Sequence, residues 1–426
     1  MKINILLLGS GGREHIFAVK LSASLLCNQL FIAPGNAGTA KVGINVSLPL
    51  LDFSAIGEFA LQNSIEMIVV GPEDPLVAGI HDYFLANSTL KNISIIGPQK
   101  AGAMLEGSKD FSKRFMQRNC IPTAAYESFT SNQINEGIAF LQKSNFPIVL
   151  KADGLAGGKG VVICATLKEA ETELSEMLVQ NKFGKASATV VIEEFLDGIE
   201  LSVFVLTDGE SYKILPAAKD YKKIGIGETG LNTGGMGSIS PVPFADATFF
   251  YRIEEEIIKP SISGLKKEGI PFVGFLFIGI MKVGHQPFVI EYNVRMGDPE
   301  TQSVFSRVKN DLVEVFQALA KKELHTQQLI IDERTAVTVV LVSEGYPGEF
   351  EKGKVISGID NIRNAEVYHA ATFEKEGEIY SNGGRVLNIT AMDFDRFAAI
   401  QNAIANAGRI YYENRYFRSD IGFEFY

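Results

Sequence analysis

The sequence is poor in cysteine, in long apolar runs and in positive charge. Its three cysteines, Cys27, Cys120 and Cys164, lie far apart and form no CxxC pair, which disfavours a zinc site or a disulfide framework and fits a reducing cytosol. No apolar stretch reaches the roughly 20 residues that span a bilayer. The apolar start MKINILLLGSGG lacks the small-residue cleavage site of a signal peptide. We therefore expect a cytoplasmic protein without a membrane partner.

Acidic residues outnumber basic ones. The chain has 50 Asp and Glu residues against 40 Lys and Arg residues, a formal net charge of −10, which argues against a nucleic-acid partner because such proteins present a basic face. An anionic small substrate remains possible, since local Lys and Arg side chains set the field of a site. At 426 residues the chain is too long for one compact core, so roughly two to four domains are expected.

The first part of the chain, to about residue 103, alternates apolar strands with helical segments. INILLLG, QLFIAP, MIVVGP and ISIIGP each end in Gly or Pro and are followed by a helix start. This alternation predicts an α/β fold with an N-terminal doubly wound parallel sheet, in which ligands bind beyond the carboxyl ends of the strands.

The first strand ends in a turn that is close to a dinucleotide-binding fingerprint. Two glycines are in place, but Glu14 takes the third glycine position and no acidic residue ends the next strand, so NAD is not expected. The amides of Gly11, Gly12 and Arg13 at a helix N-terminus can hold a phosphate, or the glycines serve backbone geometry alone. Glu73 is either a polar contact in the same crevice or a charge at a helix start.

A glycine-rich loop follows in the middle of the chain. FPIVLKADGLAGGKGVVI reads as strand, loop and strand, and its loop contains Gly157, Gly158 and Lys159 without matching the Walker pattern. Mobile glycine backbone predicts a lid over phosphates; a plain hairpin is the alternative. Lys151, before the loop, and Lys109, on an earlier helix, are candidate phosphate contacts, and a structural or a solvated lysine is the alternative for each.

Acidic residues flank the next turn, in VVIEEFLDGIE. Glu193 ends an apolar strand, and free backbone groups of Glu194, Phe195 and Leu196 can hydrogen-bond an adenine edge. Glu200, at the start of the following strand, can bind ribose hydroxyls. Surface acids around a hairpin are the alternative.

Two further stretches carry candidate residues. Residues 216–241 are glycine-rich and include Lys222 and Asn232, and we expect a long functional loop without secondary structure there. Beyond about residue 327 the chain becomes β-rich. Gly384 and Arg385 lie at the start of a predicted strand. They form either the tip of a hairpin or a second phosphate-binding site.

The stretch FVIEYNVRMGDPET carries the most specific chemistry. A two-residue period places Ile290 on an apolar face and Glu291, Asn293 and Arg295 on a polar face. Carboxylate and amide oxygens suit Mg²⁺, and a fixed Arg suits a phosphoryl group in transfer. The polar face of an edge strand is the alternative. The strand ends at a turn that contains Asp298.

Taken in order, the glycine loop, EEFLDGIE and EYN resemble the ATP-grasp fold. GSGGREH, PGNAGT, GPEDPL, EGSKDF, NTGGMG, RMGDPET and NGGRV extend this nearly end to end and resemble the phosphoribosylamine–glycine ligase family. The resemblance implies a Rossmann-like domain over 1–103, an ATP-grasp domain over 104–326 with a lid subdomain at about 124–193, and a β-rich C-terminal domain over 327–426.

The resemblance also implies an activity, which is the ATP-dependent ligation of glycine to 5-phosphoribosylamine through a glycyl phosphate, in de novo purine biosynthesis. ATP and Mg²⁺ or Mn²⁺ are the expected cofactors, and we expect a monomer. The implied ATP and metal contacts are Glu291 and Asn293 for the metal, Glu193, Glu194, Phe195, Leu196 and Glu200 for the nucleoside, and Lys109, Lys151, Gly157, Gly158, Lys159, Lys222 and Asn232 for the phosphates and nearby loop. The implied substrate contacts are Arg295 and Asp298 for glycine and its acyl phosphate, and Gly11, Gly12, Arg13, Glu73, Gly384 and Arg385 for phosphoribosylamine.

Two features bear on this reading. The family usually has Gln-Asp-His-Lys where this chain has Lys219-Asp220-Tyr221-Lys222, so the resemblance assigns no contacts to Lys219 and Tyr221. The strand before Glu291, FLFIGIM, carries no acidic ligand, as is usual in the family, so phosphates or water would complete the shell of the metal. Another ATP-grasp ligase, a Rossmann oxidoreductase and a non-catalytic ATP-binding module are the alternatives.

Overall fold

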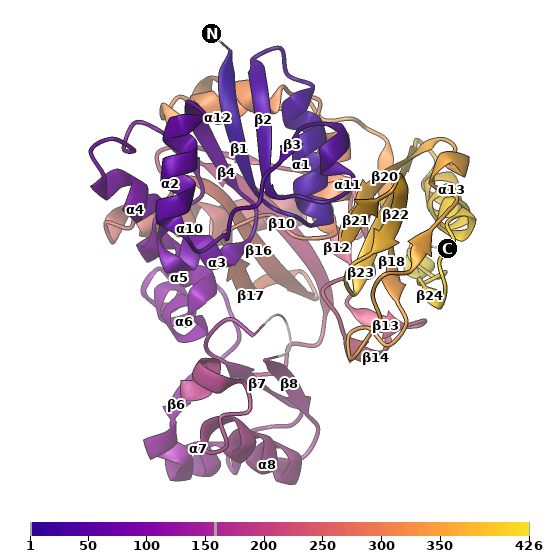
Figure 1. Cartoon of the computed structure of the whole chain (residues 1–426). Helices are drawn as coiled ribbons and strands as arrows, with labels where there is room; N and C mark the ends of the chain where they lie inside the picture. Colours follow the sequence, from indigo (N-terminus) through magenta and orange to yellow (C-terminus); the bar gives the residue numbers. More distant parts are fainter. Residues whose placement is uncertain (1, 157–159, 426) are drawn as a thin grey trace.

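Five parallel strands form the N-terminal sheet of the computed structural model, which describes residues 2–156 and 160–425. In spatial order the strands are β3 (Ile44–Asn45), β2 (Cys27–Pro34), β1 (Ile3–Gly9), β4 (Ile65–Val70) and β5 (Ser94–Ile96). All their pairings are parallel, so the predicted N-terminal parallel sheet is confirmed (Figure 1).

Helices cover both faces of this sheet. Alternate residues of β1 point to opposite sides, since Leu6 and Leu8 join one core and Ile5 and Leu7 join the other. Burial on both faces explains why these strands read as continuous apolar runs. The helices of this part and its neighbours are α1 (Gly12–Ser22), α2 (Phe53–Gln62), α3 (Glu73–Ala78), α4 (Ile80–Ala86), α5 (Lys100–Gly107), α6 (Lys109–Arg118), α11 (Glu300–Arg307) and α12 (Leu312–Ala320).

A four-stranded antiparallel sheet lies at the centre of the chain. In spatial order it contains β11 (Tyr212–Ile214), β10 (Ile199–Thr207), β16 (Gly274–Val283) and β17 (Gln286–Asn293). One face packs on a continuous helical stretch, and the apolar residues of both belong to the same core cluster as α2 and α4. That stretch consists of α9 (Ala247–Ile253), a π-helical turn (Glu254–Ile258) and α10 (Lys259–Lys267).

A second antiparallel sheet projects below the rest of the molecule in the view of Figure 1. Its core is separate and includes Phe129, Leu150, Leu174 and Ile192. We call it the small sheet; in spatial order it contains β6 (Tyr126–Thr130), β9 (Thr189–Glu194), β7 (Ile148–Ala152) and β8 (Val161–Cys164), with α7 (Ile134–Leu141) and α8 (Leu167–Leu178) packed on it.

The C-terminal sheet is also antiparallel. In spatial order it contains β12 (Lys219–Asp220), β15 (Gly237–Ser240), β18 (Thr335–Ser343), β23 (Arg385–Asp393) and β20 (Ala365–His369), with β24 (Arg415–Tyr416) on β18. Helix α13 (Arg396–Arg409) packs against it through Ala399, Ile400 and Ala403. A smaller sheet of β19 (Val355–Ile356), β22 (Glu378–Ser381) and β21 (Thr372–Lys375) lies beside it.

The expectation of a structureless loop over 216–241 is wrong. This segment contributes β12 and β15 to the C-terminal sheet and forms a hairpin of β13 (Lys223–Gly225) and β14 (Thr229–Asn232). The strands are two to four residues long, too short to show a period. Strand β15 exists because it pairs with β18, about a hundred residues further along the chain.

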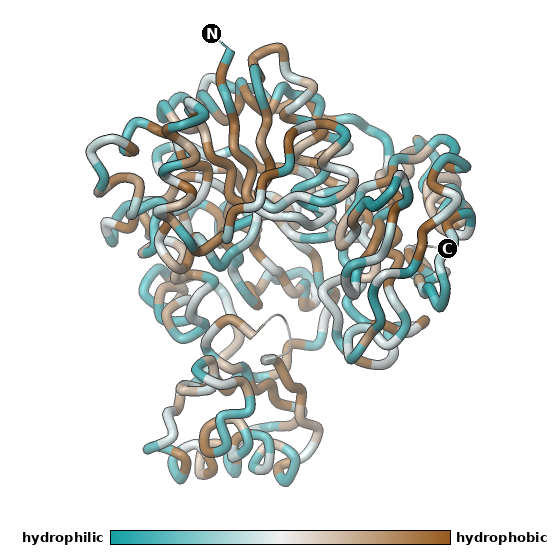
Figure 2. The backbone as a smooth tube through the Cα atoms, viewed as in Figure 1, coloured by the Kyte–Doolittle hydropathy of each residue, from teal (hydrophilic) through white to brown (hydrophobic). Residues whose placement is uncertain are grey.

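Apolar residues concentrate in the strands of the N-terminal sheet, and polar residues cover the outer helices (Figure 2). Across the described residues, no helix has both the length and the apolar character needed to cross a membrane.

Two buried histidines connect the N-terminal sheet to the C-terminal sheet. The backbone amide of His369, at the end of β20, donates to Nδ1 of His15 on α1 over 2.7 Å. Asn36 adds two bonds from its side-chain amide, to the carbonyls of Ser10 and His369. Burial, together with the charge of Lys41, lowers the pKa of His15 to about 4. Burial, together with His15 and Lys41, lowers the pKa of His369 to about 3, so both rings are neutral at pH 7.

These shifts predict a loss of stability in mild acid. Histidine has a pKa of 6.5 when unperturbed, so the unfolded chain binds protons at these two rings before the folded chain does, and the free energy of unfolding falls as pH drops from 6.5 towards 4. Each unit of pKa difference is worth about 1.4 kcal/mol. Urea unfolding of the wild type and of His15→Gln, which keeps an acceptor but cannot be protonated, should show a flatter pH dependence in the variant.

The matched control is His325→Gln, which changes an exposed histidine and should leave the pH dependence as in the wild type. Equal slopes for His15→Gln and the wild type between pH 6.5 and 4 would show that His15 does not titrate on unfolding.

Candidate functional site

Strand β17 contains a bulge that aims its polar residues. The pairing with β16 leaves Ile290 without a partner, so Val289 and Tyr292 are buried while Ile290 stays half-exposed. The predicted place of Ile290 on the apolar face is therefore wrong, because a bulge shifts the alternation by one residue. The carbonyl that it frees accepts a hydrogen bond from Lys151 Nζ over 3.0 Å.

Glu291, the next residue on β17, lies among cations without being bonded to one of them. Its carboxylate accepts no hydrogen bond from residues 2–156 or 160–425. Burial pushes the pKa of Glu291 up, but the field of its cationic neighbours outweighs burial and lowers the pKa below its ordinary value. Glu291 is thus an ionised carboxylate open to a ligand. The neighbours are Lys222, Lys151, Lys109 and Arg295.

Asn293 completes the polar face of β17. It is buried, its Oδ1 accepts from Arg295 Nη2 over 3.3 Å, and its Nδ2 has no hydrogen-bond partner, although buried amides are normally paired. The described residues contain no cluster of three His, Cys, Asp or Glu that could hold a metal by itself. The carboxylate of Glu291 and the Oδ1 atom of Asn293 supply two oxygen ligands, which fits a divalent cation whose remaining ligands are phosphate oxygens or water.

Two carboxylates hold Arg295. Its Nε lies 3.1 Å from Glu73 Oε2 and its Nη2 lies 2.8 Å from Glu106 Oε1, and Glu106 also accepts from the amide of Val294 over 2.8 Å. Glu73 is both the first residue of α3 and a partner of the site arginine, so both readings of this residue apply. The sequence reading did not assign a role to Glu106, whose only signal was its place in the EGSKDF motif.

The two carboxylates titrate differently. Burial raises the pKa of Glu106 to about 7 despite the nearby charge of Arg295. Burial acts in the same direction on Glu73, but Arg295, Arg13 and hydrogen bonds outweigh it and lower the pKa of Glu73 to about 2. Arg295 therefore keeps at least one ionised partner at all physiological pH values.

Glu193 forms ion pairs with two lysines, and its Oε1 makes no hydrogen bond within the described residues. Its carboxylate lies 2.9 Å from Lys113 Nζ and 3.0 Å from Lys151 Nζ, and only 3% of the residue is exposed. Strand β9 therefore fixes Lys151, which also reaches the carbonyl of Ile290. The role of Lys113 could not be predicted from the sequence, because a lysine on a helix is usually solvated and carries no distinctive pattern.

The backbone after Glu193 is only partly free. Of the backbone groups expected to be free, the amide of Glu194 donates to the carbonyl of Ala125 over 3.0 Å. The amide of Leu196 has no partner in the part of the chain that the structure describes. Phe195 is 37% exposed, beside the turn that leads into β10.

Lys222, two residues after β12, forms an ion pair with Glu200 of β10. Burial acts to lower the pKa of Lys222, but the carboxylates of Asp220, Glu200 and Glu291 outweigh it and raise the pKa well above its ordinary value. The structure does not bring Asn232 into this group: it is exposed and lies opposite Lys223 in the β13–β14 hairpin.

The residues that depart from the family pattern lie on the other face of the β12 segment. Lys219 Nζ lies 3.0 Å from a carboxylate oxygen of Glu424, and Tyr221 OH donates to the same oxygen over 2.9 Å. The period of two places Lys219 and Tyr221 on this side and Asp220 and Lys222 on the other. The departures thus contact the C-terminal segment and leave the cationic group around Glu291 intact.

The glycine-rich loop is described up to residue 156 and again from residue 160. Gly157, Gly158 and Lys159, predicted to close over phosphates, lie outside the described residues. Lys109 Nζ donates to the carbonyl of Gly154 over 3.3 Å, which links α6 to the start of the loop.

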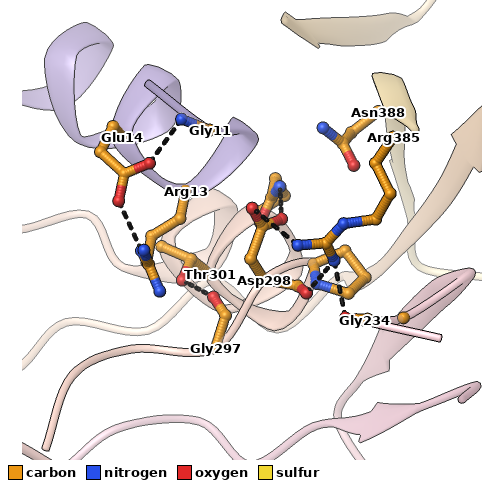
Figure 3. A network of polar contacts seen from close by, with 12 residues as sticks. Gly11, Arg13, Glu14, Gly234, Gly297, Asp298, Thr301, Arg385 and Asn388 are labelled. Carbon is orange, nitrogen blue, oxygen red and sulfur yellow. Dashed lines mark hydrogen bonds and ion pairs between the residues drawn. The ribbon is translucent and has the colours of Figure 1, made fainter. Parts of the chain in front are cut away.

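Figure 3 shows a second polar network, in which residues of α1, of the turn before α11 and of β23 meet around Asp298. Arg385 Nη2 lies 3.4 Å from Asp298 Oδ2, and Arg385 Nη1 donates to the carbonyls of Asp298 and Gly234. Burial would raise the pKa of Asp298, but Arg385 and Arg13 outweigh it and lower the pKa. The network joins the turn before α11 to the start of β23.

Carboxylates already occupy the N-terminus of α1. The amide of Gly11 donates to Glu14 Oε2 over 2.6 Å, and a hydrogen bond from the Arg13 backbone lowers the pKa of Asp298. Negative charge at this position stabilises the helix. A phosphate on the Gly11 amide would have to displace Glu14, so the Arg13 and Arg385 guanidinium groups are better placed to meet an anion.

Two of the predicted glycines are required for close packing. A Cβ on Gly12 would lie 2.2 Å from Asn388 Nδ2, and one on Gly384 would lie 2.3 Å from the ring of Tyr346. Next to Gly12, Asn388 Oδ1 and Gln302 Oε1 are buried acceptors without a hydrogen-bond partner. Neither amide carried a sequence signal, and each is a candidate acceptor for ligand hydroxyls.

Three family models match the chain in succession. They describe the N domain, the ATP-grasp (A) domain and the C domain of phosphoribosylglycinamide synthetase, and they match residues 3–106, 107–301 and 336–424.

Named relatives and solved structures agree with these models. The phosphoribosylamine–glycine ligases of Pasteurella multocida and Haemophilus influenzae are each 44% identical to the chain, over 99% of its length and 98% of theirs. The crystal structure of the Thermotoga maritima enzyme of that name has a TM-score of 0.84 at 34% identity and covers 98% of this chain and 100% of its own.

A more distant structure shares the fold alone. The biotin carboxylase domain of Hydrogenobacter thermophilus 2-oxoglutarate carboxylase, solved with MgADP, has a TM-score of 0.72 at 17% identity and covers 98% of this chain and 92% of its own. The full-length matches above carry the assignment. The chain belongs to the phosphoribosylglycinamide synthetase family of ATP-grasp ligases.

Proposed function

We propose that this chain joins glycine to 5-phosphoribosylamine at the expense of ATP and forms glycinamide ribonucleotide, ADP and phosphate. The observation that carries the proposal is the open, ionised carboxylate of Glu291 among four cations, in a chain of this family. Such a group needs an incoming partner, and a metal–nucleotide pair supplies both a cation for the carboxylate and phosphates for the lysines.

Glu291 and Asn293 would hold the divalent ion, either Mg²⁺ or Mn²⁺, which when bound neutralises phosphate charge. Lys109 and Lys151 meet the phosphates from the side of α6 and β7, and their positions are fixed by Gly154 and by Glu193. The unpaired amide of Leu196 binds the adenine edge beside the exposed ring of Phe195.

The chemistry is two successive displacements. A carboxylate oxygen of glycine attacks the γ-phosphorus of ATP, and ADP leaves. The amine of phosphoribosylamine then attacks the carbonyl carbon of glycyl phosphate, the bond from carbon to the phosphate oxygen breaks, and phosphate leaves with a proton from the amine. The protein orients the reactants and neutralises charge without a covalent step.

Arg295 acts where the acyl phosphate forms. Ion pairs with Glu73 and Glu106 fix the guanidinium group of Arg295, so its charge is oriented before the substrate arrives. Its Nη2 reaches Asn293 Oδ1, next to Glu291.

Phosphoribosylamine binds at the network around Asp298, which lies beyond Arg295 along the chain. Arg13 and Arg385 meet its phosphate, Asp298 attracts its amine, and the unpaired oxygens of Gln302 and Asn388 accept from its hydroxyls. All these groups come from one chain, so the proposed functional unit is a monomer.

A coupled assay tests the activity and the intermediate together. ADP release should require glycine and phosphoribosylamine, and glycine labelled with ¹⁸O in its carboxylate should transfer one labelled oxygen to the released phosphate, because the bridging oxygen of glycyl phosphate leaves with phosphorus. Mass spectrometry of the phosphate reads the label. Replacing glycine by bicarbonate is the control; turnover with bicarbonate, or unlabelled phosphate from labelled glycine, would refute the proposal.

Removing the charge of Glu291 should abolish most of the activity. We expect Glu291→Gln to lower kcat/KM by about 100-fold or more, since it removes a metal ligand that acts in the transition state, while the far-ultraviolet circular dichroism stays unchanged. Glu66→Gln, an exposed residue of β4, is the matched control. Near wild-type turnover of Glu291→Gln at millimolar Mg²⁺ would exclude Glu291 as a ligand.

Arg385 should matter for one substrate only. Arg385→Lys keeps the positive charge but loses the guanidinium group that donates to Gly234 and Asp298. The KM for phosphoribosylamine should therefore rise by about tenfold, which corresponds to the loss of one charge-assisted hydrogen bond. The KM values for ATP and glycine should change little. Arg409→Lys, on the exposed end of α13, is the control. A uniform rise for all three substrates would point to a structural role for Arg385.

A further inference from the structure

A cavity of about 520 Å³ lies away from the candidate site, between the segment after β11, helix α9 with its π-helical turn, and the end of α11. None of the residues proposed to bind ATP, metal, glycine or phosphoribosylamine lines it. Its volume is in the range of small-molecule sites, which are mostly apolar with a few placed polar groups. The apolar lining includes Leu215, Val242, Phe250, Ile253 and Ile258.

One buried arginine lines this cavity. Arg307, the last residue of α11, is 7% exposed. Its Nε donates to the backbone carbonyl of Asp332 over 3.1 Å, and its Nη1 donates to Ser240 Oγ over 2.8 Å. Both acceptors are neutral, no described carboxylate lies within ion-pair distance, and Nη2 donates to no described residue. Burial lowers the pKa of Arg307 and the more distant charge of Asp332 raises it, but no described carboxylate contacts the guanidinium, and a buried charge without a contacting counter-ion is costly.

The carboxylates around Arg307 are engaged with other groups. The carboxylate of Asp332 lies 3.2 Å from Lys309 Nζ and 2.9 Å from Arg334 Nη2, so it is already shared by two cations. The opposite wall carries Glu254, whose Oε1 accepts from Tyr212 OH over 2.7 Å. An acid in the same cavity opposes a doubly charged phosphate more than a singly charged ligand.

We propose that this cavity binds a small amphipathic monocarboxylate, with its carboxylate on Arg307 and its apolar body against Phe250, Ile253 and the neighbouring apolar wall. A guanidinium fork matches a carboxylate, and the low-dielectric lining strengthens the pair. The ligand is distinct from glycine, which has no apolar body to fill the space. The site stands independently of the proposed ligase activity, and it lies one helix length from Asp298, about 12 Å along the eight residues of α11.

The probe for the test is 4-phenylbutyrate, titrated into the full chain by saturation-transfer NMR and calorimetry. Saturating MgADP and glycine are present throughout, so that carboxylate binding at the candidate active site is blocked. We expect 1:1 binding to the wild type and at least tenfold weaker binding of the neutral isostere 4-phenylbutanamide. No binding of 4-phenylbutyrate, or equal binding of the acid and the amide, overturns the proposal.

Two variants locate the site. Arg307→Gln should weaken binding of 4-phenylbutyrate at least tenfold, and Arg409→Gln, on an exposed arginine, should leave it unchanged. Because Arg307 also bonds to Ser240 and Asp332, its variant could misfold, so Ala247→Phe provides a second variant that fills the cavity from an exposed position. It should weaken binding to a similar degree. Wild-type affinity in Ala247→Phe, or in a folded Arg307→Gln, places the ligand elsewhere and overturns the proposal.

Discussion

The site depends on the electrostatic field that the surrounding cations create at Glu291. A carboxylate at this depth is stable as an anion only because Lys222, Lys151, Lys109 and Arg295 surround it. Each of these cations is anchored elsewhere, so none collapses onto Glu291 as a simple ion pair. The result is a group of mixed charges held apart, and an ion together with phosphates would fill the space between them better than the protein does alone.

The anchors come from parts of the chain that are distant in sequence. The lysine from β7 is held by Glu193 of β9 and by the carbonyl that the β17 bulge exposes. Arg295 is held by acids from α3 and α5, and Asp298 by an arginine from the C-terminal sheet. The site therefore lies where the N-terminal, central, small and C-terminal sheets meet, and folding of each sheet contributes to its geometry.

The sequence predicts those features that local pattern determines. The parallel N-terminal sheet follows from apolar runs that end in Gly or Pro, and the polar face of β17 follows from a two-residue period. Long-range pairing is what local pattern misses. Strand β15 forms only against β18, the bulge at Ile290 arises from the register with β16, and Ala125 takes the amide of Glu194. Glu106, Gln302 and Asn388 can be identified as site residues only from the neighbours that the folded chain gives them.

The departures from the family pattern illustrate how an alternating strand separates two tasks. Lys219 and Tyr221 face Glu424, with the lysine 3.9 Å from the centre of the tyrosine ring, while Asp220 and Lys222 face Glu200 and Glu291. The first face needs a partner in the C-terminal segment, and Glu424 supplies it for both Lys219 and Tyr221. The second face carries the charges that act on Glu200 and Glu291. Alternation along this segment therefore separates contacts with the C-terminal segment from contacts with the cationic group around Glu291.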